Sequence, residues 1–508
     1  MATLRMFAER FRRAPLPGVT AGPFALLVAG LAAAVVAGMV TAMIGSQGDS
    51  RAAYYVAVFA SIIIGGVVAV TRKEPLRFTF LALILLFPIA TALVPPGRLE
   101  ITVFDVIMCA LTIGLLRRKV FASPEEREPF FPTPSLLVAC LLCIPCIVLS
   151  QFPFLSLQVS VLRFFTYAFF ILALSELWRE KGFERLVLLF SIVTLFMAIG
   201  LFIDHFLHVN LSLRGSNLNQ LTYVSGLQIY RAGGFFQDPQ RAGAFLACMI
   251  TFLLLLSIRG RFRGMNLRFV VWAAIAVSCA ALITTISRSA ILACLFVSGV
   301  ALFASNRWNA LAKLAVMGSA VIVAIVVTLT PADMWLSIVP ATVSERFQRS
   351  NEEFDNRLAI WFDTWDMFAD HPLTGIGAGS FRSYLIETRP TTFNYYDIGT
   401  AEGVIYIPDQ PENGYLKILY EGGILGSIAA LLVVGDALRR GIGVIARSNT
   451  DPDARTEGIA ALAGLMVFGI TFVTLYTLGD PRMAAVFLFF LALIWHRSIQ
   501  REQIAAKA

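Results

Sequence analysis

Two polar stretches near the C-terminal end decide the fold: NRLAIWFDTWDMFADHPLTGIGAGSFRSYL at residues 356–385 and DQPENGYLKILYEGGILGSI at residues 409–428. They belong to the one long polar interval of the chain, which follows eleven apolar segments of membrane-spanning length. In the first stretch, Arg357 and Trp361 stand one helical turn apart, which predicts an amphipathic helix. The two stretches therefore predict a folded polar segment between membrane helices.

A tight turn and a new helix are expected after this amphipathic helix. His371 and the proline after it precede the glycines of GIGAG at residues 375–379, a pattern that stops a helix and forms a turn. No strand precedes these glycines, so a dinucleotide-binding loop is not expected. Pro411 suits the first turn of the next helix. The early residues of that helix, expected to face the water-filled boundary, are Glu412, Asn413 and Tyr415.

Composition places the chain among membrane proteins. Of its 508 residues, 57% are hydrophobic and only 15% are charged. The net charge of +8 could suggest nucleic acid, but the basic residues cluster in short segments between apolar runs. All seven cysteines fall in apolar runs, so a thiol pair or metal site at Cys143 and Cys146 is not expected. The pair His205 and His208 is explained by polarity at the outer end of a helix.

Apolar runs of spanning length begin near residues 22, 52, 78, 101, 135, 157, 185, 242, 269, 289, 314, 414, 458 and 482. They predict an all-α integral membrane protein, a polytopic bundle of about 14 transmembrane helices with a large external loop of short helices. We expect about 11 spans in residues 1–330, the large loop in 331–413 and about 3 spans in 414–508. Within the loop, residues 391–409 could hold a short pair of strands.

The distribution of basic residues predicts the orientation. With a cytoplasmic N-terminus, the inside segments hold about two thirds of the 41 lysines and arginines. Both termini are then cytoplasmic, and the long loops 205–241 and 331–413 lie outside. The apolar run after the basic residues 1–21 is too long for a signal peptide, which predicts a retained first membrane helix. Because the cytoplasmic loops are short, any chemistry is expected in the membrane or at its outer face.

Arginines on the expected outer side are the strongest chemical signal. They run against the charge bias, and a guanidinium can bind a diphosphate through two hydrogen bonds. Taken singly, each also fits an interfacial anchor whose charged end reaches the surface. The set is Arg163, Arg231, Arg241, Arg288 and Arg357. Asp105, within the fourth apolar run, is expected to be functional or paired.

This order of parts resembles the shared C-terminal region of the O-antigen ligase and Wzy-type polysaccharide polymerase superfamily. That family shows an Arg-aromatic helix, a His-Pro…Gly-x-Gly turn, and an Asn-x-x-Leu helix start that ends in Glu-x-Gly-x-x-Gly. The resemblance covers roughly the last half of the chain. It implies that Arg231, Arg288 and Arg357 bind the diphosphate of a lipid-linked glycan, whereas Arg241 stands where the family often has a small residue.

Position 412 departs from the family pattern. Similar ligases carry a histidine there, which is thought to act as the base on the acceptor hydroxyl, and this chain has Glu412. A carboxylate can also serve as a base, or it can simply be an acid favoured by the helix macrodipole. Asp409 is the expected helix cap, and the i,i+4 spacing of Lys417 and Glu421 predicts an ion pair rather than catalysis. The other candidates in this region are His371, Asn413 and Tyr415.

The resemblance implies an inner-membrane glycosyltransferase that needs neither metal nor cofactor. It would join O-antigen or exopolysaccharide repeat units carried on undecaprenyl diphosphate, at the periplasmic face. Its expected partners are a lipid-linked donor and acceptor, the bilayer and a chain-length regulator, but no nucleic acid. A polymerase is favoured over a ligase that transfers glycan to the lipid A core, because position 412 is not histidine. A lipid-linked oligosaccharide flippase is the alternative from another class, although it would usually show internal repeats.

Overall fold

The structure is a computed structural model. Most of the residues that it describes lie in long apolar helices. The described residues are 112, 134–207, 211, 221–224, 227–236, 238–262, 265–303, 358, 360–388, 411–447 and 451–507. Six helices among them are long and apolar enough to cross a membrane, by length and composition. Two shorter apolar helices are α6 (Pro134–Val148) and α10 (Arg288–Phe303).

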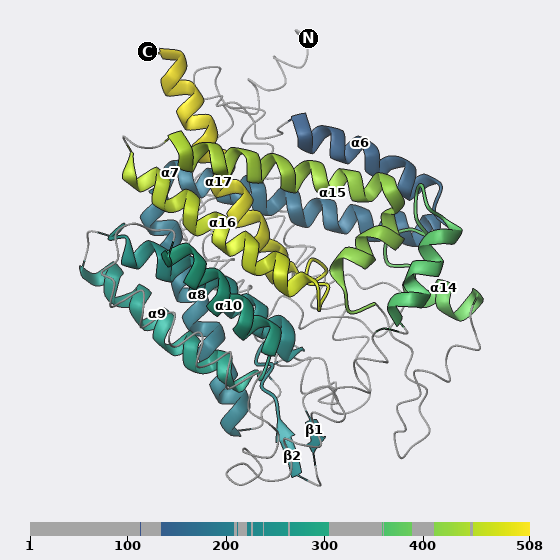
Figure 1. Ribbon diagram of the computed structural model, residues 1–508, viewed down its shortest axis with the longest axis horizontal. Coiled ribbons are helices and arrows are strands. Elements are labelled where there is room, and N and C mark those ends of the chain that lie inside the picture. The colour runs from purple at the N-terminus through teal and green to yellow at the C-terminus, as the bar shows by residue number, and fades with distance from the viewer. Residues whose placement is uncertain are drawn as a thin grey trace, which may run out of the picture.

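The six spanning segments pack together in one bundle (Figure 1). They lie in α7 (Pro153–Leu207), α8 (Pro239–Ile258), α9 (Met265–Thr284), α15 (Gly414–Arg447), α16 (Pro452–Phe472) and α17 (Pro481–Lys507). The prediction of a multi-pass helical membrane protein is confirmed for these segments. The predicted total of about 14 spans stays a prediction, because the apolar runs near residues 22, 52, 78, 101 and 314 begin outside the described residues.

Helix α7 contains two of the predicted spans, joined at Gly182. The backbone there has φ 77 and ψ 167, which glycine adopts without steric cost. Before this point, Tyr167 hydrogen-bonds to the loop between α16 and α17. Just after it, Glu184 lies 3.8 Å from Arg261, at the opposite end of the bundle from Tyr167. Asp204, near the end of α7, lies at the same end as Tyr167 and contacts the loop before α8. The chain therefore reverses direction at Gly182.

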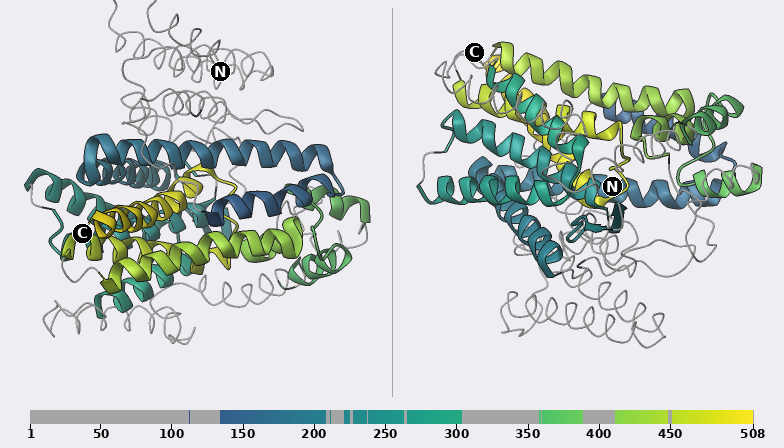
Figure 2. Two further views of the ribbon diagram at one scale, coloured as in Figure 1. Left: turned by 90° about the horizontal axis from the view of Figure 1, so that it is seen from above. Right: turned by 60° about the horizontal axis from the view of Figure 1, so that its bottom comes forward.

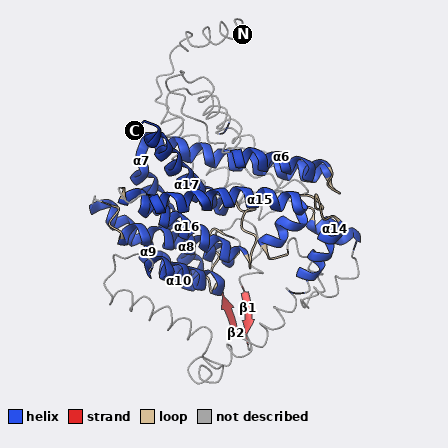
Figure 3. Ribbon diagram, turned by 45° about the horizontal axis from the view of Figure 1, so that its top comes forward, coloured by secondary structure: helices blue, strands red, loops and turns tan. Residues whose placement is uncertain are grey.

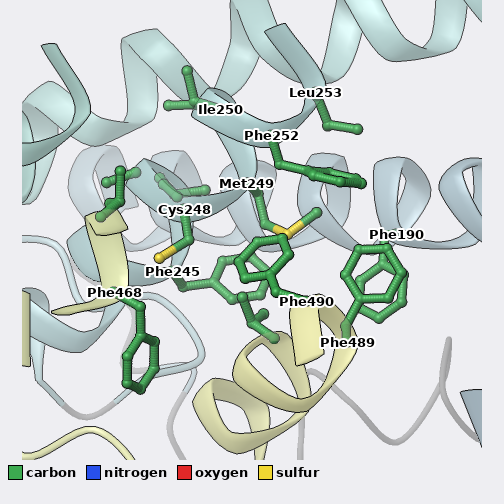
Figure 4. Close-up of a cluster of buried hydrophobic side chains, with 14 of the residues drawn as sticks. Phe190, Phe245, Cys248, Met249, Ile250, Phe252, Leu253, Phe468, Phe489 and Phe490 are labelled. Carbon is green, nitrogen blue, oxygen red and sulfur yellow. The ribbon is translucent and has the colours of Figure 1, made fainter. Parts of the chain in front are cut away.

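Helix α8 lies at the centre of the hydrophobic core and is buried along most of its length. It packs against α7, α9, α10, α16 and α17. Figure 4 shows its Phe252 beside Phe489 and Phe490 of α17, with ring centroids 5.2 and 5.3 Å away. Phe489 also stacks on Phe190 of α7, at 4.2 Å. Because lipid tails are as apolar as these rings, close packing is what holds such helices together in a membrane.

One face of the bundle is formed by a pair of helices that are far apart in sequence. Helix α6 runs along α15, and the short helix α14 (Phe381–Thr388) lies near the end of this pair (Figures 2 and 3). Residues 360–370, which precede α14, are helical as the amphipathic pattern predicts. A small second core forms around them, with Met367, Phe381 and Tyr420 buried together.

Charged side chains mark the end of the bundle where α8 passes into α9 and α15 into α16. Glu457 is fully buried there, and Arg261 and Arg497 each donate a hydrogen bond of 2.7 Å to its Oε1. A buried carboxylate is costly unless it is paired in this way. This end corresponds to the predicted cytoplasmic side, and the opposite end holds the candidate site.

A two-stranded hairpin of β1 (Leu221–Val224) and β2 (Leu227–Tyr230) leads the chain into that opposite end. The strands are antiparallel, with Leu221 opposite Tyr230. This hairpin is not among the predicted elements, although LTYV and LQIY are rich in the aromatic and branched residues that favour strands. The strand pair considered at 391–409 lies outside the described residues.

Candidate active site

Helix α15 is broken at Gly423, where φ is 60 and ψ is −156. The glycine-rich turn at residues 372–379 lies against the break and provides its backbone partners. Four hydrogen bonds of 2.8–3.1 Å join the amides of Ile376, Gly377, Ile424 and Leu425 to the carbonyls of Tyr420, Glu421, Pro372 and Leu373, respectively. In a membrane protein the polar backbone at such a break must be satisfied within the protein. The turn and the broken helix therefore form one structural unit.

This contact explains why glycine is needed at two positions. A Cβ atom on Gly423 would lie 2.5 Å from the carbonyl carbon of Leu373 and 2.6 Å from the amide nitrogen of Gly375. A Cβ atom on Gly375 would lie 2.4 Å from the carbonyl oxygen of Tyr420. Both glycines also have positive φ. The two glycine motifs that are separate in sequence are thus the two sides of one backbone contact.

The N-terminus of α15 is capped by Asn413. Its Oδ1 accepts hydrogen bonds from the amides of Tyr415 and Leu416, at 3.0 and 3.1 Å, which satisfies two otherwise free amides of the first turn. The expectation that Asp409 caps this helix is therefore wrong. Pro411 also lies before the helix rather than in its first turn, and its carbonyl accepts a 2.9 Å bond from the indole of Trp361.

Glu412 directly precedes this cap. Its φ of 48 is in the left-handed region, which is uncommon for a residue other than glycine. Such backbone conformations persist only where the surrounding structure imposes them, and they cluster at functional sites. Helix α15 has no acidic residue in its first turn. Glu412 is therefore not one of the first-turn acids that the macrodipole explanation assumes.

A cluster of charges surrounds the carboxylate of Glu421. Arg163 of α7 donates to Oε2 at 3.0 Å, and the amide of Gly379 donates to Oε1 at 2.8 Å. The ammonium of Lys417 lies 3.7 Å from Oε1, so the i,i+4 ion pair is present as predicted. The cations of Lys417 and Arg163 lie 4.3 and 5.6 Å from the ring centroid of Tyr476. Glu421 thus joins α7, α15 and the glycine-rich turn.

The loop between α16 and α17, residues 473–480, connects this cluster to its surroundings. Thr474 donates a 3.1 Å hydrogen bond to Ser289 in the first turn of α10. The carbonyl of Leu478 accepts from Tyr167 of α7 at 3.3 Å. Burial raises the pKa of the Tyr476 phenol, so its hydroxyl stays protonated. The 473–480 loop therefore links three helices at the candidate site.

A fully buried ion pair fixes the end of this loop. Asp480 accepts two hydrogen bonds from the guanidinium of Arg482, at 2.9 and 2.6 Å. Burial alone would raise the pKa of Asp480, but the neighbouring Arg482 holds it below its ordinary value. Arg482 also donates a 2.7 Å bond to the carbonyl of Phe235, in the loop before α8. The pair thereby joins the start of α17 to that loop.

Arg231 lies at the beginning of the loop before α8. The buried carboxylate of Asp204 accepts hydrogen bonds from the amides of Gly233 and Gly234, at 2.8 and 2.6 Å, and holds this loop against α7. The Nε of Arg231 donates to the carbonyl of Thr285 at 3.4 Å. Arg231 is consequently fixed beside the short connection between α9 and α10.

Two further arginines lie at helix starts near this connection. Arg288 is exposed and begins α10, three residues after Thr285. Arg241 is in the first turn of α8, 3.8 Å from Asp238, the residue that caps that helix. The Nε of Arg241 is buried and has no hydrogen-bond partner among the described residues. Helix N-termini attract anions, so cations at two such starts make this region strongly favourable for a phosphate group.

The predicted site residues are thus distributed over two neighbouring groups. Arg231, Arg241 and Arg288 lie around the starts of α8 and α10, whereas Arg163 is paired with Glu421. The predicted residues that lie outside the described part of the chain are Asp105, Arg357 and Asp409.

Two other predicted residues make local contacts. His371 places its Nε2 3.1 Å from the side-chain nitrogen of Gln151 and meets the ring of Tyr384 edge-on. Tyr415 is half exposed and donates to the carbonyl of Gly469 at 2.9 Å.

Sequence reasoning missed Tyr476, Asp480 and Arg482. Their signal was present, because an acid and a base flank a proline at the start of the last apolar run. Ionisable residues at a membrane boundary are expensive and usually paired or functional. What the sequence could not indicate is that this pair lies against the loop that carries Arg231.

Comparison with known protein families supports the resemblance noted from the motifs. Residues 273–431 match the family model described as O-Antigen ligase, whereas no curated protein matches the chain. The matched residues include Arg288, the glycine-rich turn, Glu412 and the break in α15. Members of this family are membrane enzymes that transfer glycosyl groups. The match over residues 273–431 therefore supports the resemblance of this part of the chain to the O-antigen ligase and Wzy-type polymerase superfamily.

Proposed function

We propose that the chain is an inner-membrane glycosyltransferase that polymerises O-antigen or exopolysaccharide repeat units carried on undecaprenyl diphosphate. A hydroxyl of the acceptor sugar attacks the anomeric carbon of the donor glycan and forms the new glycosidic bond. The bond from that carbon to the diphosphate oxygen breaks, and the polyprenyl diphosphate leaves with the electron pair. The hydroxyl proton passes to a base. Guanidinium groups, rather than a metal ion, stabilise the charge on the leaving group.

The gathering of arginines at one end of the bundle carries this proposal. Arg231 contacts the connection that leads directly into Arg288, and Arg241 lies at the neighbouring helix start with a buried Nε free to donate. A diphosphate can accept hydrogen bonds from several guanidinium groups at once. Arg357, which the family resemblance assigns to the same diphosphate, is proposed as a further ligand.

Glu412 is the proposed base. It precedes the capped start of α15 in a constrained backbone conformation, next to Asn413. It also occupies the position of the histidine in similar ligases. A carboxylate in this place can accept the hydroxyl proton when the acceptor is held within hydrogen-bond reach. The absence of that histidine is the reason to prefer a polymerase over a ligase.

The arginine-bearing end is proposed to face the periplasm, with both termini in the cytoplasm. Basic residues at the opposite end support this orientation, among them Arg259 and Arg261 in the connection between α8 and α9, and Arg439 and Arg440 in the C-terminal part of α15. A chain-length regulator is proposed as an additional partner.

The decisive experiment gives the purified protein a lipid-linked repeat unit in a lipid nanodisc, without an ion gradient. We expect a ladder of lengthened lipid-linked products on a gel. Transfer to lipid A core, with no ladder, would identify a ligase instead. Movement of the lipid-linked substrate across liposome membranes without a new glycosidic bond would identify a transporter.

Variants test the assigned residues in the same assay. Arg231→Lys and Arg288→Lys should each lower turnover by roughly 10²–10³, as the loss of one oxyanion donor does, because lysine cannot form the bidentate contact. Glu412→Gln should lower turnover by about 10²–10⁴ while donor binding persists. Arg382→Lys, at an exposed position on α14, is the matched control. Normal polymerisation by all three variants would contradict the assignment.

A further inference from the structure

We propose that Glu421 is a positioning residue for glycosyl transfer. Through its ion pair with Arg163, it holds the first part of α15, and hence Glu412 and Asn413, in place against α7. This inference rests on the proposed function, since it assigns a role to a residue that supports the reacting groups without touching substrate.

The Glu421 carboxylate is bound from several directions. Arg163 donates to Oε2 at 3.0 Å, the amide of Gly379 donates to Oε1 at 2.8 Å, and the hydroxyl of Tyr420 lies 3.5 Å from Oε1. The side chain is only 9% exposed. Ionisable groups at membrane depth are costly and are kept where they pair and serve a function. Glu421 is paired with Arg163, and it lies on α15, the helix that follows directly after the proposed base Glu412 and its neighbour Asn413.

The break at Gly423 gives this pair its importance. In an unbroken helix, the hydrogen-bond ladder would fix the direction of residues 414–422 relative to the rest of α15. Here that ladder is interrupted, and the glycine-rich turn holds only the end of the segment nearest the break. The Arg163–Glu421 pair is a side-chain contact that ties the segment to α7. The bonds from Trp361 to Pro411 and from Tyr415 to Gly469 also restrain the start of the segment, but neither of them ties it to α7. Without the ion pair, residues 414–422 can therefore tilt about Gly423 away from α7, and Glu412 shifts with them.

The charge balance of the cluster predicts how substitutions combine. Two cations, Arg163 and Lys417, flank the single carboxylate of Glu421 beside the neutral ring of Tyr476. Glu421→Gln keeps the shape of the side chain but leaves both cations without this counter-charge. Removing the Arg163 charge as well relieves the imbalance. Residues that act as one unit show such non-additive effects.

The test is a double-mutant cycle with separate kinetics for donor and acceptor. We compare wild type, Glu421→Gln, Arg163→Gln and the double variant at equal folded amounts in nanodiscs. Glu421→Gln should lower kcat by about 10²-fold, the effect of a misplacement near 1 Å, with KM for the donor unchanged. The double variant should be no slower than Glu421→Gln. Glu387→Gln, on the exposed surface of α14, is the matched control and should behave as wild type.

Several outcomes would overturn the inference. An unchanged kcat for Glu421→Gln would remove the positioning role. Additive losses in the double variant would mean that Arg163 contacts the substrate itself. If Glu421→Gln does not fold, Glu421→Asp takes its place, because it keeps the charge but shortens the side chain. It should also lower kcat at constant donor KM, and an unchanged kcat would again count against the role.

A second readout does not depend on activity. Spin labels on cysteines placed at Val161 of α7 and Tyr415 of α15, both exposed, report the distance between the two elements. Glu421→Gln should broaden or shift this distance distribution, whereas Glu387→Gln should not. An unchanged distribution would refute the positioning role even if the protein proved to have another activity. A wild-type protein that forms no glycosidic bond would refute the proposed function alone.

Discussion

Replacing Gly423 with alanine should disrupt the broken helix, while the same change one residue earlier should not. The added Cβ of Gly423→Ala would overlap the backbone of Leu373 and Gly375, at 2.5 and 2.6 Å. A Cβ on Gly422 would meet no atom within 4 Å. The two substitutions therefore add the same methyl group to adjacent positions, and they differ only in local geometry.

The expected magnitude follows from that geometry. Alanine at φ 60 and ψ −156 is strained by about 1–3 kcal/mol. Separating the two backbones far enough to fit the methyl group would break at least two of the four hydrogen bonds across the contact, at about 0.5–1.5 kcal/mol each. Together these give a loss of roughly 2–6 kcal/mol in the free energy of unfolding. Gly422→Ala lies in helical backbone and should be neutral, or stabilising by about 0.5–1 kcal/mol.

Reversible unfolding in mixed micelles measures this difference. Each variant is titrated with dodecyl sulfate, and helix content is followed by circular dichroism. Gly423→Ala should unfold at a clearly lower fraction of dodecyl sulfate than wild type, and should also lose transferase activity. If the two alanine variants unfold together, the backbone contact between the turn and α15 does not carry the stability ascribed to it.

Two more predictions concern the buried ion pair and the orientation. Asp480→Asn leaves the Arg482 guanidinium buried without its charge partner, so the free energy of unfolding should fall by about 3–5 kcal/mol in the same titration, and wild-type stability would contradict this. Because the folded pKa of Asp480 is lowered, its contribution is complete above the ordinary aspartate pKa of about 3.9 and is lost only as the pH falls below it. In a cysteine-free background, a membrane-impermeant thiol reagent added to spheroplasts should modify a cysteine at Arg382 but not one at Arg439. The reverse pattern would invert the proposed topology.

Much of the helical architecture could be predicted because membrane helices are encoded locally. A run of about 20 apolar residues is sufficient to indicate a span, and α8, α9 and α16 lie close to the predicted runs. Even the short run near residue 135 is a helix, with Pro145 inside it. Which helices become neighbours is not encoded in this local way. The central position of α8 depends on the shapes of side chains such as Phe252 and Phe489, whose contact joins distant parts of the chain.

Local features of the candidate site could be predicted from the sequence, whereas contacts between helices that are distant in sequence could not. The i,i+4 pair of Lys417 and Glu421 is set by helix geometry alone, so its spacing was enough. The break at Gly423 was not foreseen, because two adjacent glycines suggest a helix end as readily as an interruption. The bond from Arg163 to Glu421 could not be foreseen either, since it requires knowing that α7 and α15 meet. Position 409 looked like a cap because aspartate is favoured there, but Asn413 takes that role four residues later.

The 473–480 loop shows that residues 273–431, which match the O-Antigen ligase model, cannot be separated from the rest of the chain. The matched segment ends at residue 431, but its residues contact the chain beyond that point. Lys417 lies over the ring of Tyr476, and Ser289 in the first turn of α10 accepts a hydrogen bond from Thr474. The arginines at positions 231 and 241 also precede the segment. Residues 273–431 are thus not an autonomous unit. Grafting these residues into another membrane protein would transfer the motifs, but Lys417 would lose its contact with Tyr476 and Glu421 its ion pair with Arg163. A functional exchange between relatives would have to include the last two helices as well.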